Sequence, residues 1–311
     1  MKVTIATLNI SNEICKIVSE EFKNPLQAII VLRSNILKEI EDTIVLIPEH
    51  TAIDTLLLDK APLLKLIQCG AGYDYVDLDA AEKKGVIVSN AAGVNKFAVA
   101  EHTFALLLAL AKKIVFLNQS MKNGEWKRAE DIAMELNGKT IGVIGLGNIG
   151  REVAKRALAF GMRVQTVRRK QVIPEDLNIE LVDLETLLKE SDFISLNIAL
   201  NKETYHMIGK KELDLMKKSA LIINTSRGAI IDEDALYQTL LNKGISGAGI
   251  DVFSEEPLPP DAPIRSLDNV ILTPHSAART EEALKNRYRF FAKNALRVYY
   301  GKEPLNIVNR L

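Results

Sequence analysis

The strongest constraint on the fold is a glycine-rich turn in the middle of the chain. An apolar run, Ile141–Ile144, leads into Gly145-Leu146-Gly147-Asn148-Ile149-Gly150, and residues 151–158 continue with helical spacing. A strand that enters a G-x-G-x-x-G turn and a helix that leaves it are typical of a dinucleotide site, with the pyrophosphate on the helix N-terminus. We therefore expect dinucleotide contacts at Gly145, Gly147, Asn148, Ile149 and Gly150. The alternative is a glycine-rich loop that binds nothing.

Apolar strand patterns alternate with helical patterns on both sides of this turn. We expect strands at 3–8, 43–47, 63–68 and 86–89 before it, and at 163–167, 193–197, 220–224, 247–252 and 270–272 after it. Such alternation indicates βαβ units and parallel sheets, and 311 residues suffice for about two domains. We predict an α/β protein with two Rossmann-like parallel-sheet domains. A dinucleotide-binding domain, residues 94–281, is inserted into a domain made of residues 1–93 plus 282–311.

One helical run, residues 99–113, is rich in Ala and Leu and is apolar nearly all round. A helix of this kind is buried on several sides. We expect it at a domain junction or, since the chain is predicted to form a homodimer, at the subunit interface.

Composition excludes several classes of protein. Lys plus Arg and Asp plus Glu both number 40, so no net charge favours nucleic acid or an anionic membrane surface. The four His and two Cys are scattered, so no metal site is expected, and two Cys indicate a reducing, cytoplasmic setting. No apolar signal core or long apolar span is present, so we expect no membrane partner.

Five motifs in order resemble the D-2-hydroxyacid dehydrogenase family, including its glyoxylate/hydroxypyruvate reductase and phosphoglycerate dehydrogenase branches. They are Gly70-Ala71-Gly72-Tyr73-Asp74, Val99-Ala100-Glu101-His102-Thr103, Asn224-Thr225-Ser226-Arg227-Gly228, Asp251 to Pro259, and Thr273-Pro274-His275-Ser276-Ala277, together with the glycine turn. The resemblance implies a substrate domain in residues 1–93 plus 282–311. It also implies a carboxylate-binding loop at Gly70, Ala71 and Gly72, and cofactor contacts at Ile198, Thr225 and Asp251, the last to the nicotinamide carboxamide.

The family's catalytic arginine, carboxylate and histidine match Arg227, Glu256 and His275. Hydride transfer to a ketone leaves charge on oxygen, and a histidine is suited to supply the proton. A carboxylate behind the imidazole holds the ring and stabilises its protonated form. The guanidinium of Arg227 suits the carboxylate and carbonyl of a 2-oxo acid. The alternatives are a loop cation, a solvated surface acid and a structural histidine; we assign structural or surface roles to the other three histidines, His50, His102 and His206.

Two departures from the family pattern bear on cofactor and substrate. NAD-dependent relatives place an acid about 20 residues after the glycine turn, where this chain has Arg168-Arg169-Lys170. Arg168 and Arg169 suit a 2′-phosphate, so we predict NADP(H) over NAD(H), with binding of both as the alternative. In the loop where the phosphoglycerate branch carries an arginine, this chain has Ile47-Pro48-Glu49-His50. Ile47 and the negative charge of Glu49 favour a small unphosphorylated 2-oxo acid.

The sequence thus predicts an enzyme that reduces a small 2-oxo acid to the D-2-hydroxy acid with NADPH. Two alternatives stay open. One is D-3-phosphoglycerate dehydrogenase, and the other is a non-enzymatic, dinucleotide-sensing protein of the corepressor kind.

Overall fold

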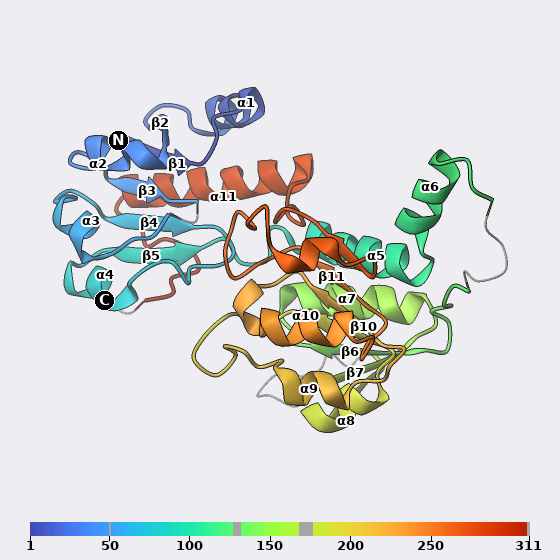
Figure 1. The fold of residues 1–311 in the computed structure, drawn as a ribbon. Coiled ribbons are helices and arrows are strands. Elements are labelled where there is room, and N and C mark those ends of the chain that lie inside the picture. The colour runs from blue at the N-terminus through green and yellow to red at the C-terminus, as the bar shows by residue number, and fades with distance from the viewer. Residues whose placement is uncertain (50, 127–131, 168–176, 310–311) are drawn as a thin grey trace. The chain divides into compact units, whose positions relative to one another are not determined.

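The computed structural model describes residues 1–49, 51–126, 132–167 and 177–309. The chain divides into two compact units (Figure 1). Unit 1 comprises Met1–Asn95 and Thr280–Leu311, and unit 2 comprises Lys96–Arg279. These boundaries differ by two residues from those expected after residues 93 and 281. The middle of the chain thus forms one unit, and its two ends form the other.

Unit 1 is built around a parallel sheet of five strands within the described residues. The strand order is β2 (Gln27–Leu32), β1 (Lys2–Thr7), β3 (Val45–Ile47), β4 (Leu66–Cys69), β5 (Ile87–Asn90). Alternate residues of one strand enter opposite cores: Leu46 packs in one cluster, while Val45 and Ile47 pack in the other. The helices of unit 1 are α1 (Asn12–Glu21), α2 (Ile36–Glu39), α3 (Thr55–Asp59), α4 (Leu78–Lys83) and α11 (Glu281–Tyr299). Helix α11 contributes the fully buried Tyr288 and Phe291 to the second cluster.

Unit 2 is built around a parallel sheet of seven strands within the described residues. The order is β12 (Val270–Leu272), β11 (Gly247–Ile250), β10 (Leu221–Asn224), β9 (Phe193–Leu196), β6 (Thr140–Ile144), β7 (Arg163–Val167), β8 (Ile179–Val182). The chain runs from β6 outward to β8 and then returns to β9 on the other side of β6. In open parallel sheets, ligands bind at the carboxyl ends of the strands beside such a switch point.

The helices of unit 2 cover both faces of this sheet. They are α5 (Lys96–Ala111), α6 (Ile114–Lys122), α7 (Asn148–Ala159), α8 (Leu184–Glu190), α9 (Lys210–Leu215) and α10 (Glu233–Leu241). Ile222 packs in one core, and its neighbours Leu221 and Ile223 pack in the other. Because strands covered on both faces need apolar side chains at every position, they appear as continuous apolar runs. The predicted fold class, two parallel-sheet α/β domains, is therefore confirmed.

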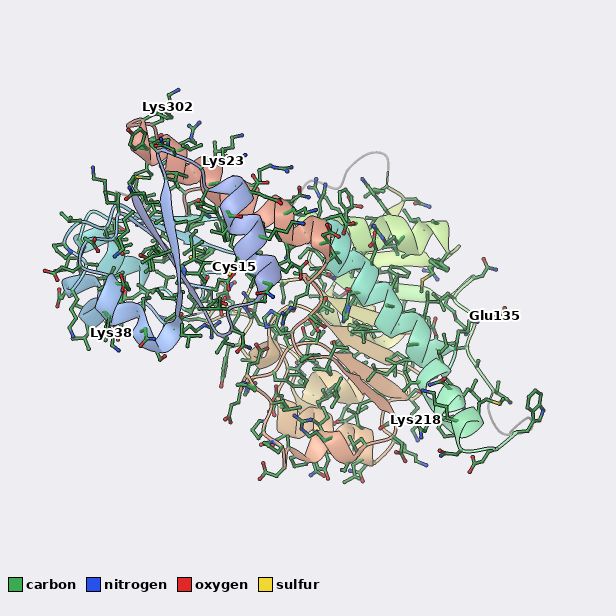
Figure 2. The ribbon with its side chains drawn as sticks, turned by 90° about the horizontal axis from the view of Figure 1, so that it is seen from above. Cys15, Lys23, Lys38, Glu135, Lys218 and Lys302 are labelled. Atoms are coloured by element: carbon green, nitrogen blue, oxygen red, sulfur yellow. The ribbon has the colours of Figure 1, made fainter. Side chains whose placement is uncertain are left out.

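Helix starts follow local capping rules. The Asp232 side chain accepts from the Ala235 amide at the start of α10, and Asp183 accepts from Thr186 at the start of α8. The four lysines labelled in Figure 2 (Lys23, Lys38, Lys218 and Lys302) are all exposed.

The apolar helix expected at residues 99–113 is α5, which begins at Lys96 and ends at Ala111. Its residues Val99, Phe104 and Leu107 are buried, and it packs against α7, β10 and β11. Strand β2, helix α6 and strand β8 were not expected from the sequence. Lys113, at φ 52°, separates α5 from α6, so one apolar run yields two helices.

Candidate active site

The glycine turn is as tight as its sequence predicts. Gly145 has φ +98°, a conformation that L side chains rarely adopt, and an added Cβ would lie 2.5 Å from the Asn197 carbonyl oxygen. An added Cβ at Gly150 would lie 1.8 Å from the Gly145 carbonyl oxygen. These two glycines are therefore required for the turn itself and for packing of α7 on the sheet.

Gly147 has a different role. It is exposed and caps the N-terminus of α7, and among described residues an added Cβ would meet no atom within 4 Å. The open space in front of the helix N-terminus, with Asn148 and Ile149 as its first residues, suits a phosphate that accepts from free backbone N–H groups. These residues fit the pyrophosphate of a dinucleotide.

The other predicted cofactor residues lie at the same edge of the sheet of unit 2. Ile198 follows β9, Thr225 follows β10 and Asp251 follows β11, while the glycine turn follows β6. The Thr225 hydroxyl lies 3.0 Å from the hydroxyl of Thr103 on α5. The structure thus brings these predicted residues to one edge, while Arg168 and Arg169 lie outside the described residues.

Arg227 follows β10 in a loop that the chain fixes locally. The Asn224 side chain donates to the Arg227 carbonyl at 2.9 Å and accepts from the Ser226 amide at 3.1 Å. The next residue, Gly228, packs so closely that an added Cβ would lie 2.0 Å from the Phe253 carbonyl carbon. The guanidinium of Arg227 is thus presented from a loop anchored on both sides.

Glu256 and His275 form a pair. His275 Nδ1 lies 2.7 Å from Glu256 Oε2, and Glu256 Oε1 accepts from the Phe253 amide at 3.0 Å. The His275 side chain is 31% exposed. The Nδ1 side of the imidazole therefore faces the carboxylate, which fixes the orientation of the ring.

The backbone at His275 is held in an uncommon conformation. Its φ is 49°, in the left-handed region, and its amide donates to the Asp251 carbonyl at 2.8 Å. Such a conformation persists when the surroundings over-determine it. The neighbouring strand β11 therefore helps to set the direction of the imidazole.

Asp251 does more than the sequence predicts. Its side chain is 1% exposed. One carboxylate oxygen accepts from the Thr273 hydroxyl at 2.6 Å and the Ser276 amide at 2.8 Å, and the other accepts from the Ala277 amide at 3.0 Å. The expected contact to a nicotinamide carboxamide remains a prediction. What the structure adds is that Asp251 anchors the loop that carries His275.

In unit 1, the loop Gly70–Gly72 follows β4. Ala91 donates to the Gly70 carbonyl at 2.9 Å, and the Asn90 side chain donates to the Ala71 carbonyl at 2.9 Å. The loop is thus held by the end of the neighbouring strand β5. Its assignment to substrate carboxylate remains a prediction.

Glu49, two residues after β3, does not carry the uncompensated negative charge expected from the sequence. Its carboxylate, 13% exposed, accepts from Arg287 at 3.0 Å and from the Tyr288 hydroxyl at 2.6 Å. Arg33, directly after β2, donates to the Glu49 carbonyl. Burial, together with the nearby Glu49 carboxylate, raises the pKa of Tyr288 far above its usual value, so Tyr288 stays a neutral donor.

This group, which we call the Glu49 cluster (Arg33, Glu49, Arg287 and Tyr288), contains two arginines and one carboxylate. The electrostatic reason for excluding a phosphate was therefore wrong, because Glu49 is neutralised in place. No pattern in the sequence pointed to the partners, since Arg287 is 238 positions from Glu49.

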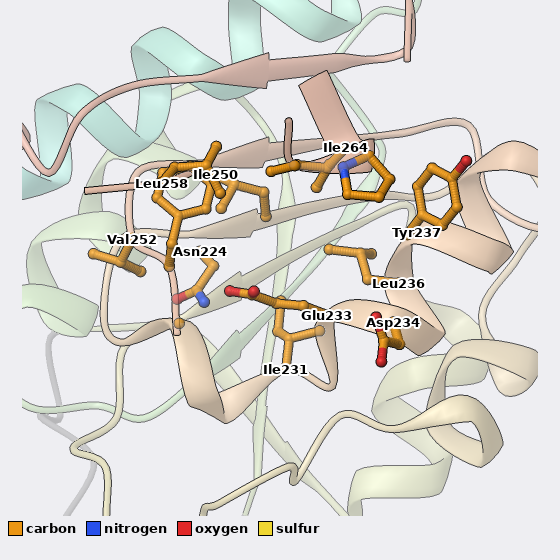
Figure 3. A pocket seen from close by; sticks show the side chains of 14 residues that line it. Asn224, Ile231, Glu233, Asp234, Leu236, Tyr237, Ile250, Val252, Leu258 and Ile264 are labelled. Carbon is orange, nitrogen blue, oxygen red and sulfur yellow. The ribbon is translucent and has the colours of Figure 1, made fainter. Parts of the chain in front are cut away.

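A small cavity of about 90 Å³ lies in unit 2, lined mainly by residues of α10 and of the segment that follows β11 (Figure 3). It is mainly apolar, and its polar lining includes Glu233 and Asp234. Glu233 also accepts from the Ser254 amide at 2.7 Å. Acidic side chains do not suit an anionic dinucleotide, so the lining of this cavity does not match the cofactor.

Within the described ranges, no group of His, Cys, Asp and Glu side chains is arranged to hold a metal ion. In the same part of the chain, every helix is too short or too polar to cross a membrane.

Comparison with known proteins agrees with this geometry. Residues 104–277 match the family model of the D-isomer specific 2-hydroxyacid dehydrogenase, NAD binding domain. The chain is 44% identical over 283 residues to a glyoxylate reductase of Thermococcus litoralis, covering 88% of this chain and 85% of the relative. It is also 44% identical over 284 residues to a D-3-phosphoglycerate dehydrogenase of Methanocaldococcus jannaschii, covering 89% of this chain but only 54% of that relative.

Among solved structures, a D-lactate dehydrogenase from Aquifex aeolicus complexed with NAD and lactic acid is similar. Its TM-score is 0.88 at 33% identity, and the match covers 99% of each chain. The chain therefore belongs to the D-isomer specific 2-hydroxyacid dehydrogenases, NAD(P)-dependent enzymes that act on the CH–OH group of a 2-hydroxy acid. Its cofactor is a nicotinamide dinucleotide, and its reaction class includes reduction of 2-oxo acids.

Proposed function

We propose that this enzyme reduces a small, unphosphorylated 2-oxo acid, such as glyoxylate or hydroxypyruvate, to the D-2-hydroxy acid with NADPH. The observation that carries the proposal is the His275–Glu256 pair. Glu256 follows β11, which is adjacent to the strand that precedes Arg227, and His275 follows β12, the next strand of the same sheet. The similarity to a glyoxylate reductase along most of both chains supports the substrate class.

The roles of the residues follow from their contacts. Arg227 binds the substrate carboxylate and polarises the neighbouring carbonyl with its fork of donors. His275 donates a proton from Nε2 to the carbonyl oxygen as charge develops there. Glu256, bonded to Nδ1 and fixed by the Phe253 amide, keeps the ring oriented and stabilises its charged form. The bound dinucleotide supplies the hydride.

NADPH preference rests on the sequence alone, because Arg168 and Arg169 stand where NAD-dependent relatives carry an acid. The direct test compares kcat/KM for NADPH and NADH in the wild type and in Arg168→Asp. We expect NADPH to be preferred and the substitution to weaken that preference by about tenfold or more. A wild type that prefers NADH would refute the assignment.

The second candidate function is D-3-phosphoglycerate dehydrogenase, and one observation favours it. The Glu49 cluster carries two arginines against one carboxylate at the carboxyl edge of the sheet of unit 1, a charge balance that suits an additional anionic group on the substrate.

Initial rates with glyoxylate, hydroxypyruvate, pyruvate and 3-phosphohydroxypyruvate distinguish the two functions. Fast turnover of the small acids supports the first. Turnover mainly of the phosphorylated acid would replace it with the second.

We also propose that the enzyme is a homodimer. Helix α6 carries exposed apolar side chains, with Ile114 53%, Val115 54% and Met121 54% exposed, and Phe97 of α5 is 53% exposed. Exposed apolar patches on a helix are typical of protein interfaces. Light scattering of the wild type and of Val115→Asp tests this: we expect a dimer that the substitution weakens. A monomeric wild type would refute it.

Cytoplasmic location stays a prediction of the sequence.

A further inference from the structure

His102 on α5 lies beside the anchor of the catalytic loop. Its Nε2 is 3.0 Å from the Thr273 hydroxyl and 3.6 Å from Asp251 Oδ1. The His102 side chain is 23% exposed, whereas the Asp251 carboxylate is buried. From its sequence context, His102 is expected to have a structural or surface role; its position beside Thr273 and Asp251 indicates a more specific one.

The direction of these hydrogen bonds follows from the number of protons. The Thr273 hydroxyl has one proton, which it donates to the Asp251 carboxylate at 2.6 Å. The hydroxyl therefore accepts from His102, which carries a proton on Nε2. His102 thus donates to the group that holds Asp251, and it orients that group.

Asp251 in turn holds the loop of His275 at several points. Its carboxylate accepts from the amides of Ser276 and Ala277, and its carbonyl accepts from the amide of His275. Since His275 adopts a left-handed backbone conformation, its geometry depends on these bonds. A chain of contacts therefore runs from α5 to the proposed proton donor, entirely within unit 2.

The neighbouring residue on α5 makes a parallel contact. Thr103 lies 3.0 Å from Thr225, two residues before Arg227. A single turn of α5 therefore contacts both the loop of Arg227 and the loop of His275, which sets it apart from a helix that only fills the core.

We infer that His102 is a positioning residue for the reduction: by donating to Thr273 it fixes the Asp251 carboxylate and, through it, the loop that aims His275. This inference rests on the proposed function of His275. Outer-shell residues that orient the ligands of metal sites contribute about 10- to 100-fold to affinity or activity, and we expect an effect of this order here.

The test compares His102→Leu with His102→Gln, which keeps a side-chain N–H donor. We expect His102→Leu to lower kcat about tenfold or more with the KM for the 2-oxo acid changed by less than about threefold, and His102→Gln to restore most of the loss. Hydrogen exchange of a peptide covering residues 273–277 gives a readout independent of activity. It should speed up in His102→Leu and return toward the wild-type rate in His102→Gln.

His206→Asn is the matched control. His206 also lies in unit 2, where it stacks on Tyr205 with ring centroids 4.0 Å apart, and asparagine tolerates its φ of 48°. This variant should leave kcat and loop exchange unchanged.

Thr273→Val gives a second route should His102→Leu fail to fold. In the Thr273→Val background, adding His102→Gln should not change kcat further, because the hydroxyl that links residue 102 to Asp251 is gone. Wild-type kcat in His102→Leu, unaltered exchange of the 273–277 peptide, or additive effects with Thr273→Val would each overturn the inference. A wild type inactive on every 2-oxo acid would instead count against the proposed function, and the exchange data would still report on the loop.

Discussion

The carboxyl edges of the two parallel sheets share a plan but differ in how their polar side chains are fixed. In unit 2, the Glu256–His275 and Asp251–Ser276 contacts join residues 19 and 25 positions apart, on loops after neighbouring strands. In unit 1, Glu49 is held by Arg287, 238 positions away. The edge of unit 2, where we place the chemistry, is thus encoded in short motifs, whereas the edge of unit 1 depends on a pairing between residues far apart in the sequence.

The largest effect expected concerns the chemical edge. We expect His275→Asn to lower kcat for reduction by about 10²- to 10⁴-fold, because it removes the proton donor. Asparagine tolerates the left-handed backbone at this position, so the loop should keep its conformation. Initial rates measure the loss, and His206→Asn, at a similar φ, serves as the control. A loss of less than about tenfold would remove His275 from the mechanism.

In the glycine turn, Gly147 and Gly150 are expected to have different roles, the first in dinucleotide binding and the second also in the stability of the fold. An added methyl at Gly147 meets no described atom, while one at Gly150 lies 1.8 Å from the Gly145 carbonyl oxygen. We therefore expect Gly147→Ala to keep the wild-type melting temperature but weaken dinucleotide binding about tenfold or more. Gly150→Ala should lower both. Fluorescence titration and thermal melting check this, and unaltered binding in Gly147→Ala would show that the phosphate lies elsewhere.

The pH dependence has a definite sign. Reduction by the proposed mechanism needs a proton on His275, so its rate should fall as pH rises, by up to about tenfold per pH unit. Oxidation of the hydroxy acid needs the neutral ring and should fall as pH decreases. Rate profiles in both directions check this. Flat profiles in both directions would argue that another group exchanges the proton.

The Glu49 cluster provides a matching test in unit 1. Arg287→Met leaves the Glu49 carboxylate with one less donor, and we expect a loss of about 1–2 kcal/mol of stability in urea unfolding. Glu49→Gln should cost less, and the double variant should cost less than the sum of the two. Additive losses would mean that the pair is not coupled. The same variants should change the ratio of phosphorylated to small-acid turnover more than variants on α6 do.

The smallest effect expected concerns the two thiols. Burial raises the pKa of Cys69 to about 12, whereas Cys15 is exposed. A thiol reagent should modify Cys15 in the native protein and Cys69 only after unfolding, with activity changed by less than about twofold. Rapid native labelling of Cys69, which directly precedes the Gly70–Gly72 loop, would show that this loop opens readily.

The sequence predicts most of unit 2 because its strands are continuous apolar runs and its polar residues directly follow them. Arg227 comes three residues after β10 and His275 three residues after β12, so parallel strands bring both to one edge. Strand β2 escaped prediction since it lies at the sheet edge and is only half buried. Helix α6 escaped because its exposed apolar side chains extend the pattern of α5.

The site was predicted less completely than the fold. Asp251 was identified as a cofactor contact, but its hydrogen bonds to Thr273, Ser276 and Ala277 require the loop geometry. Sequence spacing could not identify the partners of Glu49 on α11, because the whole of unit 2 lies between β3 and α11 in the chain.

That nesting has a consequence for the order in which a nascent chain matures. Asn294 of α11 donates to Gln68 and Ser89, and Asn309 accepts from the Val88 amide, so the sheet of unit 1 is completed by residues that follow the whole of unit 2 in the chain. Unit 2 has its whole sequence by residue 279. Since domains generally fold as units during synthesis, unit 2 is expected to fold before unit 1, because residues 1–95 emerge early but need the segment that begins at Thr280 to complete their unit.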